Sequence, residues 1–389
     1  MATLEQTTEF LRDLIAFPSI SSDSNLAIIN YLADHLRGVG ADVQLQMASC
    51  GNKANLFATI GPNGPDVPGG IVLSGHSDVV PVADQDWTYD PFDMTERGGK
   101  LYGRGTCDMK GFIGATLAKA ADFANAPLNR PVHFAFTHDE ETGCIGAQAL
   151  AEWLTARSIR PSLAIIGEPT MLQVIEGHKG CCEYTTHFRG LAGHGSMPNL
   201  GVNAVEYAVR YVSYLMEMAQ ELKTRAPINS RFEPPWTTIN TGSLMGGAIH
   251  NVIPQTATVQ WEFRPVQDSD FSFVKEKIED YVHTVLLPAM RAVDPAAAIT
   301  TEIMGEVAGL EPAGINEARD ILMELTGSNT SNVVPFGTEA GIFASLGMNV
   351  AVCGPGSIEQ AHKPDEFIAI DQLTKCLTML DGLEAKLSK

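Results

Sequence analysis

Four side chains of types that bind metal ions follow three short apolar runs of the sequence. The side chains are those of His76, Glu140, Glu141 and Glu168, and the runs before them are Ile71–Gly75, Val132–Thr137 and Leu163–Ile166. Runs of this length and composition are typical of buried strands. In an open α/β sheet, functional sites form beyond the carboxyl ends of the strands. We therefore expect these four side chains to meet at one edge of a sheet.

Two further polar residues have comparable positions. Asp108 follows the glycine-rich turn Gly103-Arg104-Gly105 and begins a predicted helix, whereas His362 follows a predicted strand and the turn Gly354-Pro355-Gly356. Imidazole and carboxylate ligands together suit zinc, with cobalt or manganese as substitutes, while calcium and magnesium prefer oxygen ligands alone. We predict two zinc ions, because three carboxylates balance most of the charge of two divalent cations. The predicted ligands are His76, Asp108, Glu141, Glu168 and His362.

Each of these residues has an ordinary structural alternative when it is considered alone. Glu168 fits an acid at the end of a strand, and Glu140 and Glu141 fit charges at the start of a helix. Either histidine fits a buried or surface side chain, but all of these residues fall at predicted strand ends or turns. Asp78, two residues after His76, is predicted to fix the ring of that histidine. Ligating histidines usually donate their other N–H group to a carboxylate or a carbonyl.

The apolar pattern around these residues predicts an α/β fold with a mixed sheet. Strand-like runs alternate with helical stretches, which is typical of a sheet covered by helices on both faces. The predicted helical stretches are two between Leu4 and Gly38 and others at 111–124, 145–156, 315–325 and 371–387, and further strands are predicted from Asp42 and at 349–353.

A different order of elements between residues 180 and 306 predicts a second, inserted domain. The segments are a strand at 181–188, a helix at 202–225, strands at 237–244 and 256–263, a helix at 271–292 and a strand at 298–303. This is the β-α-β-β-α-β order of ferredoxin-like folds. We therefore predict a discontinuous metal-binding catalytic domain formed by residues 1–179 and 307–389, and an inserted domain formed by residues 180–306. A chain of 389 residues is long enough for two cores.

The composition argues against several classes of function. The 26 basic and 46 acidic residues give a formal net charge of -20, and a surface of this sign repels nucleic acids and anionic membranes. We find no apolar stretch of the roughly 18 residues needed to span a bilayer. The sequence begins without the basic head and apolar run of a signal peptide. The seven cysteines suggest no disulfide framework, and we expect a cytoplasmic protein with reduced thiols.

Five motifs resemble those of the M20 family of metallopeptidases and deacylases, and the resemblance extends over nearly the whole chain. They are Ser74-Gly75-His76-Ser77-Asp78-Val79-Val80-Pro81, Gly105-Thr106-Cys107-Asp108-Met109-Lys110-Gly111, Asp139-Glu140-Glu141, Ile166-Gly167-Glu168-Pro169-Thr170 and His362-Lys363-Pro364-Asp365-Glu366. The resemblance implies that Asp108 bridges two metal ions and precedes a cis peptide bond. His76 and Glu168 would complete one metal site, and Glu141 and His362 would complete the other.

The same resemblance implies that the inserted domain is a lid and dimerisation domain. His194 in Gly193-His194-Gly195-Ser196 matches a histidine that reaches the active site of the partner subunit. Here Gly195 stands where serine or alanine is more usual. Asn251 and Arg264 match residues that grip the carboxylate of the substrate, a task that suits the guanidinium fork. A homodimer formed through this domain is therefore expected.

Within the family, three motifs resemble the acetylornithine deacetylase branch. They are Gly177-His178-Lys179-Gly180, Gly337-Thr338-Glu339-Ala340 and Gly354-Pro355-Gly356-Ser357-Ile358-Glu359-Gln360-Ala361-His362. The resemblance implies hydrolysis of the amide bond of a small N-acyl amino acid, N-acetyl-ornithine in arginine biosynthesis. Glu140 would be the general base and would not bind metal. His194 would stabilise the oxyanion.

Two alternatives stay open. The first is another acyl substrate, as in a succinyl-diaminopimelate desuccinylase, a dipeptidase or another amino-acid deacylase of the family. Glu339 discriminates between them, because a carboxylate in the substrate loop would hold the free ammonium of N-acetyl-ornithine and repel a second acidic group. The second alternative is a non-catalytic binding protein that retains the fold. The complete set of candidate ligands together with Glu140 argues against it.

Overall fold

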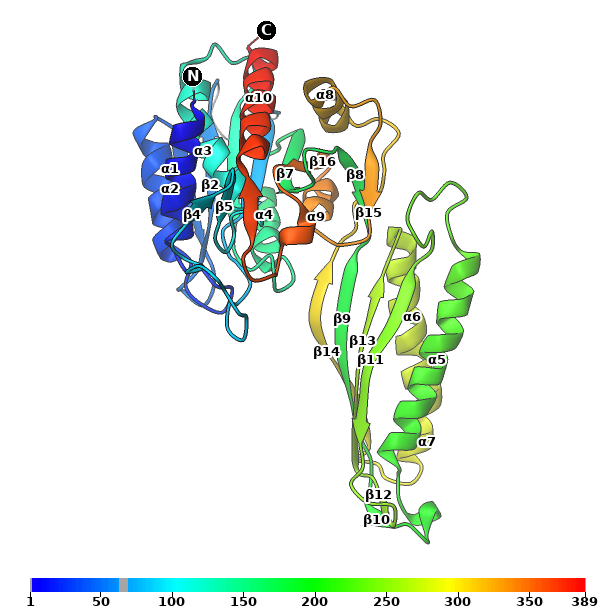
Figure 1. Cartoon of the computed structure of the whole chain (residues 1–389). Coiled ribbons are helices and arrows are strands. Elements are labelled where there is room, and N and C mark those ends of the chain that lie inside the picture. Colours follow the sequence, from blue (N-terminus) through cyan, green and yellow to red (C-terminus); the bar gives the residue numbers. More distant parts are fainter. Residues whose placement is uncertain (1, 63–68, 389) are drawn as a thin grey trace. The chain divides into compact units, whose positions relative to one another are not determined.

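The computed structural model describes residues 2–62 and 69–388, which form two compact units (Figure 1). The larger unit comprises Met1–Gly177, Pro312–Val333 and Thr338–Lys389, and the inserted unit comprises His178–Glu311 with Val334–Gly337. The inserted unit extends slightly beyond both ends of the range 180–306. No helix of the described residues combines the length and the apolar character that are needed to cross a membrane.

The larger unit is built around a mixed sheet, as the sequence pattern predicts. Its described strands, in order across the sheet, are β1 (Asp42–Met47), β2 (Ala54–Ile60), β6 (Val132–Thr137), β3 (Ile71–His76), β7 (Leu163–Pro169), β16 (Asn349–Gly354), β8 (Ile175–His178) and β15 (Asn332–Val334). The four central strands β6, β3, β7 and β16 run parallel, whereas β1 and β2 are antiparallel to their neighbours. The carboxyl ends of the four parallel strands therefore lie at one edge of the sheet.

Helices cover both faces of this sheet. In β2, Leu56, Ala58 and Ile60 are buried in the main core, whereas the ring of Phe57 lies 6.1 Å from the ring of Trp153 in α4. The helices of the main core are α2 (Leu26–Gly38), α3 (Lys110–Asn125), α8 (Glu317–Thr326) and α10 (Ile370–Leu387), and those near the other face are α4 (Ile145–Ala156) and α9 (Ala340–Ser345). Burial on both faces explains why the strands read as continuous apolar runs.

A cluster of charges around a buried lysine joins α3 to α10. The ammonium group of Lys119 lies 2.8 Å from Asp122, 2.6 Å from Asp381 and 2.7 Å from Glu384. The Lys119 side chain is fully buried, so these partners replace water around its charge. On the outer side of α3 lies α1 (Leu4–Ile15), which begins with a capping box.

The inserted unit consists of an antiparallel sheet with helices on one face. Its strands, in order across the sheet, are β11 (Thr238–Gly246), β13 (Thr256–Arg264), β9 (Cys181–Arg189) and β14 (Ala298–Val307), and its helices are α5 (Ala204–Thr224), α6 (Asp268–Tyr281) and α7 (Leu287–Arg291). Alternate side chains of β9 and β13 pack under the helices, such as Tyr184 and Trp261, whose rings stack 4.6 Å apart. The elements follow the β-α-β-β-α-β order predicted from the sequence.

Two smaller sheets complete the described structure. In the inserted unit, β10 (Gly193–His194) pairs with β12 (Val252–Ile253) at the end where β9 finishes and β13 begins. In the larger unit, β5 (Lys100–Tyr102) pairs with β4 (Thr95–Arg97) and with β17 (Phe367–Ala369). The ladder between β5 and β17 brings the residues that follow Tyr102 close to those that precede Phe367.

Candidate metal centre and active site

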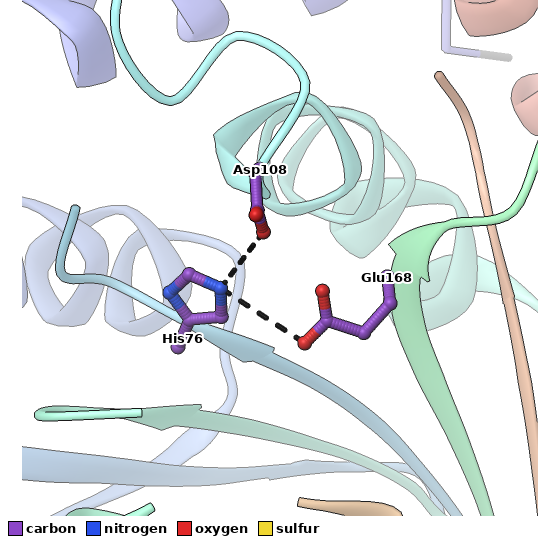
Figure 2. Close-up of side chains that lie close together, drawn as sticks. All are labelled: His76, Asp108 and Glu168. Carbon is purple, nitrogen blue, oxygen red and sulfur yellow. Dashed lines mark hydrogen bonds and ion pairs between the residues drawn. The ribbon is translucent and has the colours of Figure 1, made fainter. Parts of the chain in front are cut away.

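The carboxyl end of β3 brings His76 next to Asp108 and Glu168. Nε2 of His76 lies 3.1 Å from Oδ1 of Asp108 and 3.9 Å from Oε1 of Glu168, as Figure 2 shows. His76 is the last residue of β3, and Glu168 lies near the end of the adjacent parallel strand β7. All three side chains are buried, and Oε1 of Glu168 has no hydrogen-bond partner among the described residues. One potential ligand atom of each lies within 4.8 Å of the others.

A second cluster shares Asp108 and adds Glu141 and His362. Nε2 of His362 lies 3.5 Å from Oδ2 of Asp108 and 3.0 Å from Oε2 of Glu141. Glu141 lies in the turn between β6 and α4, and His362 follows the short 3-10 helix Ile358–Gln360. These three ligand atoms also lie within 4.8 Å of one another. The two oxygens of Asp108 therefore face different histidines, which suits a carboxylate that bridges two cations.

A tight turn between β5 and α3 presents Asp108. Gly105 has a φ of 85° in this turn, and a Cβ atom added there would lie 2.8 Å from Cγ1 of Val79, so only glycine fits without a shift. The peptide bond between Asp108 and Met109 is cis, as the resemblance implies. The buried side chain of Met109 belongs to the main core. The turn thus places a polar carboxylate at the start of a helix that is otherwise buried.

Asp78 holds the ring of His76 through its main chain. Nδ1 of His76 lies 2.9 Å from the main-chain oxygen of Asp78 but 3.6 Å from the nearest carboxylate oxygen. The carbonyl therefore accepts the Nδ1–H group, so that in the neutral ring Nε2 carries no proton and can bind metal. The carboxylate instead accepts hydrogen bonds from the main-chain N–H groups of Glu140 and Glu141 at 3.2 and 3.4 Å. This differs from the expectation that the carboxylate itself would hold the ring.

The clustered carboxylates make this edge of the sheet attractive to cations. Burial raises the pKa of Glu168 well above its ordinary value, and the negative charge of Asp108 raises it further. Burial lowers the pKa of His76, but the hydrogen bond to Asp108 and the charge of Glu168 outweigh burial and hold that pKa well above its ordinary value. Positive charge stabilises the ionised carboxylates of these clusters, and divalent cations would provide that charge in place of protons.

Glu140 lies beside the two ligand clusters without belonging to either. It is half-buried in the turn after β6, and the thiol of Cys144 donates to its Oε1 at 3.4 Å. Burial raises the pKa of Glu140 to about 8, with opposition from His76 and support from Glu141 and Asp108. A carboxyl group with a pKa in this range takes up and releases a proton readily near neutral pH.

The inserted unit places His194 and Asn251 together at one end of its sheet. His194 pairs with Val252 in the β10–β12 ladder, and the N–H group of Gly195 donates to the main-chain oxygen of Asn251 at 2.8 Å. The N–H group of Ser196 donates to Nδ1 of His194 at 3.2 Å. In the neutral ring Nε2 then carries the proton, so the exposed imidazole offers a hydrogen-bond donor.

Arg264 lies at the opposite end of the same sheet. It is the last residue of β13, whereas the first residue, Thr256, lies near the β10–β12 ladder. A strand of this length spans roughly 26 Å at about 3.3 Å per residue. Nη2 of Arg264 donates to Oε2 of Glu262 at 2.9 Å. The inserted unit therefore does not bring Arg264 and Asn251 of one chain together.

Glu339 is fully buried at the start of α9 rather than open in a loop. Its two carboxylate oxygens accept hydrogen bonds from the hydroxyl groups of Ser74 at 2.8 Å and Thr137 at 2.9 Å. Ser74 lies in β3 and Thr137 ends β6, so Glu339 joins the strands that lead to His76 and Glu140. Contact with a substrate ammonium stays a prediction.

Two buried polar side chains that support the site were not identified from the sequence. The hydroxyl group of Ser21 donates to the carboxylate of Asp78 at 2.6 Å. Glu366 accepts hydrogen bonds from the main chain of the turn that presents Asp108. Neither residue lies in a segment with a periodic apolar pattern, and the only indication was the position of Glu366 in the motif that begins at His362.

The profile of peptidase family M20/M25/M40 matches residues 72–383. The chain belongs to the M20 family. An acetylornithine deacetylase from Proteus mirabilis is 37% identical over 367 residues, which cover 92% of this chain and 91% of that protein. An acetylornithine deacetylase from Shigella sonnei is 36% identical over 367 residues, which cover 92% of each of the two chains. A solved M20 metallo-carboxypeptidase from Sulfolobus solfataricus shares the fold, with a TM-score of 0.75 and 19% identity over 98% of this chain and 99% of its own.

M20 enzymes are metal-dependent hydrolases, and this chain has side chains that fit such a metal requirement. The two clusters offer imidazole and carboxylate donors in the mixture that suits zinc. The buried Oε1 of Glu168 has no hydrogen-bond partner among the described residues, and a metal ion would satisfy it. By contrast, Asp122, Asp381 and Glu384 also lie at ligand spacing, but they surround the ammonium group of Lys119. The ammonium group therefore already occupies the position between these three carboxylates.

We expect His76→Ala and His362→Ala each to lower the metal content below two ions per chain after dialysis, because each removes one imidazole from a three-residue cluster. Elemental analysis measures this content. The matched controls are His133→Ala, at a buried histidine, and His187→Ala, at an exposed one. Both controls should keep the wild-type content. An unchanged content in either ligand variant would remove that histidine from the metal site.

Proposed function

We propose that this M20 protein is a dinuclear zinc hydrolase that removes the acetyl group of N-acetyl-ornithine, giving acetate and ornithine in arginine biosynthesis. The observation that carries the proposal is the pair of ligand clusters joined through the two oxygens of Asp108, with Glu140 beside them. Identities of 37% and 36% to two acetylornithine deacetylases support the choice of substrate. His76 and Glu168 would hold one ion, and Glu141 and His362 would hold the other.

In this proposal the side chain of Glu140 moves the proton. Two zinc ions held by the clusters would polarise the acyl carbonyl and lower the pKa of the attacking water. The carboxylate of Glu140 takes one proton from that water as the water oxygen bonds to the acyl carbon. It then gives the proton to the amine nitrogen as the C–N bond breaks, so the free amine and acetic acid leave, the acid loses its proton to solvent to become acetate, and the carboxylate of Glu140 is restored. Asp78 supports this role by holding the N–H groups of Glu140 and Glu141.

We further propose a homodimer formed through the inserted units. In the inserted sheet β11 is an edge strand, whose main-chain groups are open to pairing with another strand. Beside it, α5 and β11 line a groove of about 230 Å³, and Met216 on that helix is 64% exposed. A second copy of β11 and α5 would cover both features.

The proposed dimer gives the inserted unit a part in catalysis. The Nε2–H group of His194 is a suitable donor to the oxyanion of the partner's substrate. Asn251 lies next to His194 and would enter the same partner site, where it would bind the substrate carboxylate. Because Arg264 lies at the other end of the sheet, it would reach a substrate from a different subunit than Asn251 does.

We also propose a cytoplasmic location and a small-molecule substrate. The seven cysteines are free thiols, as expected in a reducing compartment. The net charge of -20 disfavours binding to nucleic acids and anionic membranes.

A panel of N-acyl amino acids, with the released primary amine measured, tests the substrate. N-acetyl-ornithine should give the highest kcat/KM, at least about tenfold above N-succinyl-diaminopimelate and dipeptides, because a second acidic group or a larger acyl portion would lose complementary contacts. A higher value for either of those substrates would contradict the proposed specificity. Metal-loaded protein that hydrolyses none of them would favour the non-catalytic alternative.

A further inference from the structure

The carboxylate of Glu366 binds the main chain of the turn that presents Asp108. Its Oε1 accepts hydrogen bonds from the N–H groups of Cys107 at 2.9 Å and Asp108 at 3.0 Å, and its Oε2 accepts one from Gly105 at 3.0 Å. Arg104 of the same turn donates to Oε2 through Nη1 at 2.8 Å. The side chains of Glu366 and Arg104 are each 1% exposed, so water does not compete for these bonds.

The pairing of the short strands β17 and β5 places Glu366 beside this turn. Phe367 pairs with Tyr102 in the ladder of β17 and β5, and the N–H group of Gly103 donates to the main-chain oxygen of Glu366 at 3.0 Å. These main-chain contacts hold the backbone of Glu366 beside the turn and do not depend on its side chain. Hydrogen bonds to an ionised group are stronger than those between neutral groups. Four such donors on one carboxylate therefore hold the turn strongly.

The same carboxylate is part of a network that reaches the loop of His362. Arg104, which Glu366 holds, also donates to the main-chain oxygen of Lys363 through Nη1 at 3.3 Å and to Oε1 of Gln85 through Nη2 at 2.6 Å. The amide group of Gln85 donates to the main-chain oxygen of His362 at 3.0 Å. The turn of Asp108 and the loop of His362 are therefore held in one fixed relation.

We propose that Glu366 is a positioning residue that aligns the turn of Asp108 with the loop of His362, so that the two carboxylate oxygens of Asp108 face two different histidines. The inference rests on the dinuclear site of the proposed function. Glu366 acts through Asp108, and among the described residues its carboxylate makes no hydrogen bond or ion pair with His76 or His362. Without this alignment, the carboxylate of Asp108 would be well placed for only one of the two metal sites, and the affinity for at least one cation would fall.

The test is a titration of metal-free Glu366→Gln with zinc against a competing chelator, with no substrate present. Glutamine keeps one acceptor oxygen, but its NH2 group would face Gly105 and Arg104, which only donate. At least one zinc affinity should fall about tenfold or more, as for other groups that support metal ligands. Glu176→Gln is the matched control, because it alters another buried acid, which lies 2.8 Å from Arg319 in the same unit. Its zinc affinities should stay within about twofold of wild type.

The outcomes separate this inference from the proposed function. A folded Glu366→Gln protein that binds two zinc ions as tightly as wild type would overturn the positioning role and leave the proposed function intact. Wild-type protein that binds fewer than two zinc ions would overturn the dinuclear site itself. If Glu366→Gln does not fold by circular dichroism, Gln85→Ala provides the test at a half-buried position. It should weaken zinc binding severalfold, and an unchanged affinity would contradict the proposal.

Discussion

Glu140→Gln is expected to keep two metal ions while its kcat falls by at least about a hundredfold, the usual contribution of a general base. Glutamine preserves the size of the side chain but cannot take a proton from water. Glu140 belongs to neither ligand cluster, and its main-chain bond to Asp78 does not depend on its side chain. Measurements of kcat on N-acetyl-ornithine and of metal content on the same sample test both parts.

The control for this substitution is Glu152→Gln, which makes the same change at an exposed position of α4. It should retain wild-type kcat and metal content. Loss of metal from Glu140→Gln would make Glu140 a ligand rather than a base. Full activity with the metal retained would assign the proton transfer to another group.

A mixture of His194→Ala and Glu140→Gln chains is expected to recover about a quarter of wild-type activity, although each variant alone is nearly inactive. In a mixed dimer, one site would combine the intact Glu140 of the first chain with the intact His194 of the second. Random exchange of equal amounts makes about half of the dimers mixed, and each would have one working site of two. Hydrolysis of N-acetyl-ornithine, measured after exchange between differently tagged chains is demonstrated, gives the recovery.

Two control mixtures define the interpretation of this recovery. A chain that carries both substitutions, mixed with inactive His194→Ala, should give no recovery, because no dimer would then have a complete site. His187→Ala mixed with Glu140→Gln should retain the activity expected from simple dilution of an active chain. If the mixture of His194→Ala and Glu140→Gln chains stays inactive despite exchange, His194 acts within its own chain or outside catalysis.

The candidate ligands were accessible from the sequence because strand ends have a distinct signature. His76, Glu141 and Glu168 each follow a short apolar run, and the structure brings those runs together as parallel strands. Helix periodicity likewise located α3 and α10 to within a few residues. The strand β2 (Ala54–Ile60) was missed, because the polar residues Asn55 and Thr59 interrupt its apolar run although both are buried.

Contacts between segments that are distant in sequence were not predictable in the same way. The bonds from Glu366 to the turn of Asp108 cross more than two hundred and fifty residues, and Glu339 reaches Ser74 over a similar separation. The spacing of His76 and Asp78 in the sequence does not predict whether the main-chain or the carboxylate oxygen of Asp78 faces the ring of His76. The partners of Lys119 were equally hidden, because a lysine in a helix reads as an exposed residue until its neighbours are known.

A main-chain bridge between His178 and Leu310 joins the two ends of the inserted unit, and this bridge bears on how the chain folds. His178 and Leu310 exchange both main-chain hydrogen bonds, at 3.0 and 2.9 Å, so the entry and exit of this unit lie side by side. Closing an unfolded loop of that length would cost the larger unit roughly 4 kcal/mol of chain entropy. Once the inserted unit is folded, its two ends lie close together, so it acts as a short connection between the two parts of the larger unit. If the inserted unit folds first, we therefore expect faster association of β8 with the α8 region, which are the segments that precede and follow the inserted unit.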